Sequence, residues 1–125
     1  MTLALEPIIS DAFETKRELR DDSISIALIG NADLRVRQDL AEWLVEVHAE
    51  ALRLKVKAVD VDVTALEFMN SSCFKGFVGW LTSIMALPEE QQYRVRFRSN
   101  PETLWQRRSL HALRSFALMI VTVDS

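Results

Sequence analysis

Residues 59–74 read VDVDVTALEFMNSSCF, and this stretch decides how the chain folds. Its first five residues alternate, so the three valines face one side of a predicted strand and the two aspartates face the other. Thr64 to Asn70 then form a short connection, and Ser71 and Ser72 stand where a helix begins. Free backbone N–H groups and the positive end of the helix dipole meet at such a position, which favours an anion or a phosphate.

The sequence after this stretch predicts two more helices and two more strands. Apolar residues at helical spacing predict a helix over 72–87, which Pro88 ends. Residues 93–98 alternate between apolar side chains and arginine, which is typical of a strand. A third helix is expected over 101–115, with Asn100 or Ser99 as its N-cap. Residues 118–123 predict a final strand that is largely buried.

Two glycines in the helix predicted over 72–87 lower its helix propensity. They are Gly76 and Gly79. Their expected role is close packing of this helix against the sheet.

The sequence before residue 59 predicts a β-hairpin followed by the clearest helix of the chain. The strands of the hairpin are expected over 12–19 and 23–29, joined by a polar turn at 20–22. Residues 30–33 are expected to break the second strand. The helix over 36–54 has its apolar residues on one stripe and its charged residues away from it.

These elements predict an α/β fold in the order β-β-α-β-α-β-α-β. Strands that alternate with helices imply a mainly parallel sheet, and the hairpin adds an antiparallel N-terminal edge strand beside three main helices. Residues 1–11 are expected to be a loosely held N-terminal segment, and residues 12–125 a single domain. The arginine and aspartate faces of two strands predict that one face of the sheet is partly open to solvent. The strand order stays open.

Composition narrows the function classes. The 125 residues carry a formal net charge of −3, which gives no reason to expect nucleic-acid binding. A single cysteine suits a reducing compartment and excludes an internal disulfide framework. The first residues lack the pattern of a signal peptide, and no apolar run approaches the ~20 residues that span a bilayer. We therefore expect a cytoplasmic protein without membrane insertion, and no residue pattern calls for a cofactor.

The opening stretch also resembles the signature of the STAS domain, the fold of the bacterial anti-sigma factor antagonists. That signature is a strand ending in Asp, then an aromatic–apolar pair, then two serines. Asp62 matches the strand Asp, Phe68-Met69 the aromatic–apolar pair, and Ser71-Ser72 the serines. Upstream, residues 29–34 resemble the Gly-Glu-Leu-Asp turn of the family, with Asp33 as its acid.

The resemblance implies a STAS-like domain that is a regulatory protein-binding module and not an enzyme. Its partner would be an anti-sigma factor of serine-kinase type, with a phosphatase that reverses the modification, and the module would be a monomer or weak dimer. Ser71 matches the phosphorylated serine, and Ser72 is the second choice. The implied partner-binding residues are Asp33, Asn70, Ser71, Ser72, Cys73 and Phe74.

Two residues depart from the family pattern and keep alternatives open. Asn70 replaces the acid before the serine, and Cys73 replaces the glycine after the pair. Ser71, or Asn70 beside it, would then be a helix N-cap, and an unphosphorylated loop would serve as a fixed contact surface. The alternative function is a STAS-type regulatory or scaffold subunit that docks on a transporter ATPase or signalling complex. In that case Trp105 would be an exposed interface anchor, although a half-buried helix residue is the simpler interpretation.

Other candidate residues also have a structural interpretation. Asp33 is equally an N-cap for the first helix, and Asp62 is equally a brace for the loop that follows it. Cys73 as a nucleophile lacks a base, because neither histidine is placed beside it, so structural filling is favoured. One cysteine and two histidines give no metal-ligand spacing.

The arginines of the predicted strand over 93–98 and of the third helix could bind phosphates or an acidic partner, but a solvated surface is favoured. This basic set is Arg94, Arg96, Arg98, Arg107, Arg108 and Arg114.

Overall fold

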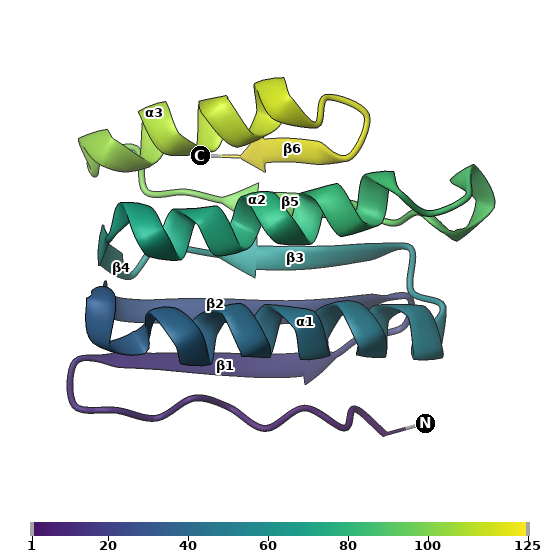
Figure 1. The fold of residues 1–125 in the computed structure, drawn as a ribbon, viewed down its shortest axis with the longest axis horizontal. Helices are drawn as coiled ribbons and strands as arrows, with labels where there is room; N and C mark the ends of the chain where they lie inside the picture. Colours follow the sequence, from purple (N-terminus) through teal and green to yellow (C-terminus); the bar gives the residue numbers. More distant parts are fainter. Residues whose placement is uncertain (1, 125) are drawn as a thin grey trace.

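The computed structural model describes residues 2–124 and has two layers, a sheet and the helices that cover one of its faces (Figure 1). The strands are β1 (Phe13–Leu19), β2 (Ser23–Ala32), β3 (Ala58–Asp62), β4 (Leu66–Met69), β5 (Arg94–Arg98) and β6 (Val121–Asp124). The helices are α1 (Arg37–Leu54), α2 (Ser71–Met85) and α3 (Leu104–Phe116), with short 3-10 turns η1 (Leu34–Val36) and η2 (Glu89–Gln91). The α/β class, the three main helices and the antiparallel β1–β2 edge confirm the predicted fold.

The strand order in the sheet is β1-β2-β3-β5-β6, and every pair except β1–β2 is parallel. Strand β3 pairs with the first residues of β2, and β4 pairs with the last residues of β2. After β3 the chain makes a short turn and then pairs with β2 again, as β4, further along β2. Both β2 and β4 end at the same edge of the sheet, where α1 and α2 begin.

The expectations of a short connection without a strand over 64–70 and of a strand break over 30–33 were wrong. Leu66–Met69 form β4, and β2 continues to Ala32. The pairing survives because Gly30 adopts a φ of +98°, which other residues rarely reach, and its N–H donates to the Ala65 carbonyl at 3.0 Å. The register shift at Gly30/Asn31 is a bulge inside a continuous strand.

The third helix begins at Leu104, three residues later than predicted. The Asn100 side chain accepts from the Glu102 N–H at 3.0 Å, and the Thr103 N–H donates to the Asn100 carbonyl at 3.0 Å. Asn100 therefore caps a turn and not the helix. The last strand also begins later than predicted, at Val121, because residues 117–120 form a turn that leaves Leu118 and Met119 exposed.

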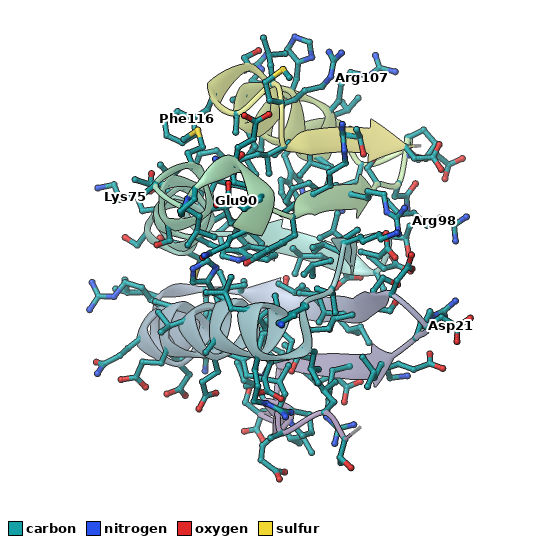
Figure 2. The ribbon with its side chains drawn as sticks, turned by 90° about the vertical axis from the view of Figure 1, so that its right-hand side faces the viewer. Asp21, Lys75, Glu90, Arg98, Arg107 and Phe116 are labelled. Atoms are coloured by element: carbon teal, nitrogen blue, oxygen red, sulfur yellow. The ribbon has the colours of Figure 1, made fainter. Side chains whose placement is uncertain are left out.

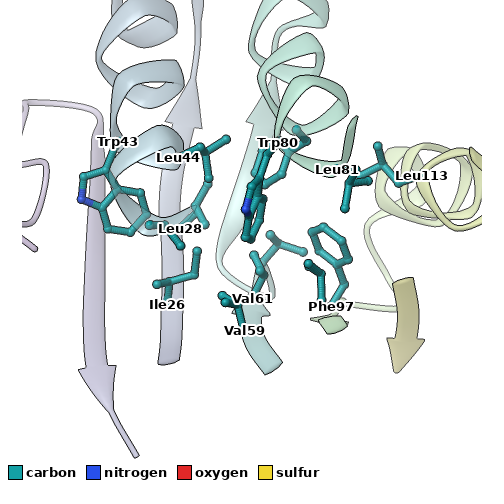
Figure 3. Close-up of a cluster of buried hydrophobic side chains, with 14 of the residues drawn as sticks. Ile26, Leu28, Trp43, Leu44, Val59, Val61, Trp80, Leu81, Phe97 and Leu113 are labelled. Atoms are coloured by element: carbon teal, nitrogen blue, oxygen red, sulfur yellow. The ribbon is translucent and has the colours of Figure 1, made fainter. Parts of the chain in front are cut away.

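The core lies between the sheet and the three helices (Figure 3). The inward residues of β2, β3 and β5 meet α1 and α2 from one side, and Leu113 of α3 closes the layer beside β5. The side chains of this cluster that Figure 3 labels are Ile26, Leu28, Trp43, Leu44, Val59, Val61, Trp80, Leu81, Phe97 and Leu113. Burial of this apolar surface supplies most of the stabilising free energy.

The opposite face of the sheet is open and charged, as predicted. Figure 2, which looks along the strands, shows Arg98 on the side away from α1 and α2. Arg96 and Asp60 are cross-strand neighbours on this face, and their side chains form an ion pair of 2.5 Å.

Residues 2–11 run beside β1 and α1 and make specific contacts (Figure 1). Leu5 is buried, and its carbonyl accepts from the Arg17 guanidinium at 2.7 Å. The Trp43 indole donates to the Glu6 carbonyl at 2.6 Å, and the Ala4 N–H donates to Glu50 at 2.6 Å.

Gly76 and Gly79 do not pack against the sheet, contrary to the expectation from their positions. A Cβ at Gly76 would meet Ala41 and Leu44 of α1 at ordinary van der Waals distances, and a Cβ at Gly79 would meet nothing within 4 Å. Both glycines line a shallow apolar groove between α1 and α2.

Candidate functional site

The end of β2 and the start of α2 meet at the end of the sheet where the parallel strands β2 and β4 finish. The Asn70 N–H donates to the Ala32 carbonyl at 2.8 Å, and the Cys73 thiol lies 3.4 Å from the Asp33 carbonyl oxygen. The structure therefore brings Asp33 together with the segment Asn70–Phe74. We call the residues Asp33 and Asn70–Phe74 the loop site.

Asn70 is the N-cap of α2. Its backbone is extended (φ −66°, ψ 148°), and its side-chain oxygen accepts from the Ser72 N–H at 2.7 Å. Its carbonyl accepts from the N–H groups of Cys73 and Phe74, both at 3.0 Å. Of the two N-caps that the sequence allowed, Asn70 and Ser71, the structure has Asn70.

Ser71 is the first residue of α2, and it is exposed. Among residues 2–124 the Ser71 hydroxyl makes no hydrogen bond that would hold it in place, and α2 has no acidic residue in its first turn. Ser72 is half-buried, so its hydroxyl is less accessible than that of Ser71. Lys75 follows Ser71 by four residues, on the same side of the helix, and is exposed.

Cys73 is buried beneath this first turn. Burial raises the pKa of the Cys73 thiol, the nearby Asp33 carboxylate raises it further, and Arg37 offsets part of the shift. The thiol is therefore protonated at neutral pH and fills space as a weak donor to the Asp33 carbonyl. Of the two histidines, His48 is bonded elsewhere, because its Nδ1 lies 2.6 Å from the Tyr93 hydroxyl.

The Asp33 carboxylate is held by its own loop. It accepts from the Arg35 N–H at 2.9 Å and pairs with the Arg35 guanidinium at 2.7 Å. These bonds lower the pKa of the Asp33 carboxyl. Asp33 is therefore the N-cap of η1, and its partly exposed carboxylate lies beside the first turn of α2.

Two exposed apolar side chains lie within two residues of the loop site: Leu34, which sequence reasoning did not single out, and Phe68, which it matched to the aromatic of the family signature. Leu34 in η1 is 59 % exposed, and Phe68 in β4 is 46 % exposed. Leu104, at the start of α3, is 80 % exposed. For Leu34 the available signal was an apolar residue between the charged Asp33 and Arg35.

The side chains of Asp62 and Trp105 hold the segment from β3 to β4 through hydrogen bonds. Asp62 accepts from the Thr64 N–H at 2.8 Å and the Thr64 hydroxyl at 2.6 Å, which is the structural role considered for it. The Trp105 indole donates to the Glu67 carbonyl at 2.8 Å, and its ring is half-buried. Trp105 therefore fixes the start of α3 against β4.

Gln106 was missed by sequence reasoning. It is completely buried, and its amide donates to the carbonyls of Val63 (2.6 Å) and Leu66 (2.8 Å). Its oxygen accepts from the Asn100 N–H at 2.8 Å. A polar residue on an otherwise amphipathic helix gave no sign that it would be buried.

The part of the chain described here, residues 2–124, has no group of three or more His, Cys, Asp or Glu side chains that could hold a metal ion. No helix within the same range is long and apolar enough to cross a bilayer.

Two solved structures share this fold. One is an anti-sigma factor antagonist from Mycobacterium paratuberculosis, 17 % identical, with a TM-score of 0.66 over 90 % of this chain and 86 % of that one. The other is the anti-sigma factor antagonist SpoIIAA in its unphosphorylated form, also 17 % identical, with a TM-score of 0.59 over 89 % and 88 %. The sequence matches no protein-family model and no curated protein. The chain therefore has the STAS fold of these anti-sigma factor antagonists.

Proposed function

We propose that the chain is a non-enzymatic, cytoplasmic partner-switching protein of the anti-sigma factor antagonist type. It captures an anti-sigma factor of serine-kinase type through the loop site, and phosphorylation of Ser71 releases that partner until a phosphatase restores the serine. The observation that carries the proposal is an exposed Ser71 hydroxyl, not engaged in capping, at the first position of α2 in a STAS fold. The SpoIIAA structure is that of an unphosphorylated form, and phosphorylation is the change of state proposed here.

The surroundings of Ser71 suit a phosphate. A phosphoserine carries nearly two negative charges, and the N-terminal end of α2 stabilises negative charge. Lys75, four residues on, supplies a cation in the favourable order along the helix. The dianion is therefore tolerated by the fold, and its effect falls on the bound partner.

The apolar residues around the loop site suit a protein partner. Exposed Leu34 and Phe68 provide contact area next to Ser71, and the buried Cys73 and half-buried Phe74 hold the first turn of α2 in place. A partner that covers these side chains would also enclose Ser71. A phosphate enclosed there would lose hydration that Lys75 and the helix end replace only in part, which would expel the partner.

A second candidate function rests on Asn70. It caps α2 with an amide where the family pattern has an acid, so the loop carries no carboxylate directly before the serine. In this version the same face docks on a transporter ATPase or a signalling complex, and Ser71 is never modified.

The test is affinity purification from the source organism, with mass spectrometry of the co-purified proteins and of the protein itself. Residues 58–75 form one tryptic peptide, so fragment ions can assign a phosphate to Ser71 or Ser72. A kinase-type anti-sigma factor together with phosphate on Ser71 supports the switch. A transport ATPase or scaffold with an unmodified peptide supports the second candidate.

Substitutions then test the switch with the purified partner. Ser71→Ala should bind as wild type and Ser71→Asp should bind at least about tenfold more weakly, as expected for a charge that the partner strips of water. Ser83→Asp, which adds the same charge at an exposed position near the other end of α2, is the matched control and should bind normally. Equal binding by Ser71→Asp and Ser71→Ala would exclude regulation at Ser71.

A further inference from the structure

A second surface lies away from the loop site, along the outer edge of β6. A groove of about 390 Å³ runs there beside α3. Arg107, His111 and Arg114 line it from α3 at positions i, i+4 and i+7, so they share one face of the helix. Figure 2 shows Arg107 reaching out from α3 next to β6.

The groove is basic in a protein that is acidic overall. The chain carries a net charge of −3, yet neither α3 nor the lining of the groove contains Asp or Glu. Within residues 2–124, four arginines pair with carboxylates, but Arg107 and Arg114 are not among them. The cationic groups are therefore available to an anionic partner.

The backbone of β6 offers free pairing groups at the same place. Strand β6 is the last in the sheet order. The Ile120 carbonyl accepts from Val95 of β5, and the Asp124 carbonyl accepts from Ser99, the residue after β5. Because backbone groups alternate along a strand, those of Val121 and Val123 point to the outer edge. The Val121 N–H donates to the Ala117 carbonyl at 2.9 Å. Within residues 2–124, Val123 is therefore left with an outward N–H and an outward C=O.

Basic side chains beside outward backbone groups favour an extended peptide over a small anion as the ligand. A phosphate or free carboxylate can use the cationic side chains and the Val123 N–H, but it cannot satisfy the outward carbonyls. An extended chain donates and accepts along the edge, as in strand addition. The seven steps from Arg107 to Arg114 rise about 10.5 Å along the helix, which is the length of about three extended residues.

We propose that this groove binds an extended acidic segment of a protein partner, which adds a strand to the free edge of β6 and sets its carboxylates against Arg107, His111 and Arg114. This site is independent of Ser71, so it holds whether or not the proposed switch does.

The probe is a fluorescein-labelled peptide of alternating glutamate and valine, nine residues long by design, titrated with the full chain in an anisotropy assay. Alternation puts every glutamate on one face of the added strand. The matched peptide has glutamine in place of glutamate. We expect the glutamate peptide to bind at least about tenfold more tightly, with affinity that falls as salt is added.

Variants of α3 and β6 then locate the site. R107A combined with R114A should weaken binding by at least about tenfold. Arg108→Ala is the matched control, because Arg108 is an exposed neighbour on α3 that does not line the groove, and it should bind within about twofold of wild type. Val123→Pro removes the outward N–H but no bond to β5, and it should also weaken binding. Thermal unfolding of each variant checks that the fold is intact.

Amide spectra identify the edge directly. Addition of the glutamate peptide should shift the signals of residues 121–124. Equal affinity for the two peptides, or an equal loss in R108A and in the double variant, would overturn the proposal. It would also be overturned if inorganic phosphate displaced the peptide and shifted the same amides, because the groove would then be a small-anion site.

Discussion

The thiol of Cys73 lies 3.4 Å from the carbonyl oxygen of Asp33, and this contact joins the first turn of α2 to the turn that follows β2. The two segments are 40 residues apart in the sequence. Where the STAS pattern has a glycine, this chain has a buried side chain that fills the space and fixes the two halves of the loop site against each other. A partner here meets a packed surface at Cys73 and not an open backbone.

Cys73 should therefore be a slow thiol in the folded protein. Burial and the Asp33 carboxylate raise the pKa of the thiol, so little thiolate exists at pH 8. Alkylation of the native protein should be at least about tenfold slower than alkylation in urea, where the thiol is free. Reaction of the folded protein at the rate of a free thiol would contradict this and would revive Cys73 as a candidate nucleophile.

Gln106 should be one of the most sensitive positions for stability. Gln106→Met keeps the approximate volume but leaves the carbonyls of Val63 and Leu66 and the N–H of Asn100 without their partner. Each unsatisfied buried group costs roughly 1–3 kcal/mol, so we expect a loss of about 3 kcal/mol or more in chemical unfolding. Gln38→Met, at an exposed position on α1, should change stability by less than about 0.5 kcal/mol.

The role of Gln106 shows where sequence reasoning ended. Strands β3 and β5 were predicted because apolar and charged side chains alternate along them, which indicates burial on one face. Helix α1 was predicted because its apolar residues repeat at helical spacing. Nothing local marks a glutamine whose three partners lie 6, 40 and 43 residues away. Strand β4 escaped prediction for the same reason, since it exists only because β2 continues past Gly30 and offers it a partner.

Only part of the loop site could be predicted from the sequence. The resemblance gave Asp33 and Asn70–Phe74, and the ends of neighbouring parallel strands predict that these residues meet. The sequence could not decide between Asn70 and Ser71 as the N-cap, because both are good caps. Their roles depend on where the backbone turns from extended to helical, and that point is fixed by the Asn70–Ala32 hydrogen bond. The exposure of Leu34 and Leu104 likewise depends on tertiary packing.

Gly79 and Gly30 should respond to alanine in opposite directions. A Cβ at Gly79 meets nothing within 4 Å, so Gly79→Ala should stabilise α2 by about 1 kcal/mol through helix propensity alone. A Cβ at Gly30 would collide with the Ala12 carbonyl, and its φ of +98° is strained for alanine. Gly30→Ala should cost at least about 2 kcal/mol. Chemical unfolding of both variants checks the pair, and a destabilised Gly79→Ala would contradict the open position of that residue.

Glu50 should make stability depend on pH at the acidic end. Hydrogen bonds from Arg53 lower the pKa of Glu50 to about 2, from a usual value near 4.5, against the opposing effect of burial. A lowered pKa in the folded state contributes stability above pH 4.5 that is lost as the pH falls toward 2. The stability gap between wild type and Glu50→Gln should therefore be largest near neutral pH and should narrow below pH 4.5.

The control for Glu50 is Glu46→Gln, an exposed position on the same helix. Its unfolding free energy should follow that of the wild type across the same range of pH. A constant gap between wild type and Glu50→Gln would contradict the linkage. Because the Ala4 N–H also donates to Glu50, acid should free the first residues from α1, which cleavage by pepsin near Leu5 would detect.

Negative charge at Ser71 should stabilise the fold while it acts on the partner. Helix α2 has no acidic residue in its first turn and no basic residue in its last, so its dipole is uncompensated at both ends. Ser71→Asp should add about 0.3–1 kcal/mol to the unfolding free energy, since the charge lies at the N-terminal end and four residues before Lys75. Ser83→Asp should lose a similar amount, because its charge lies near the C-terminal end. A more stable Ser71→Asp that no longer binds its partner would show that release takes place at the interface. A destabilised Ser71→Asp would instead mean that the loop site cannot hold the charge, and that loss of binding reports unfolding of the first turn.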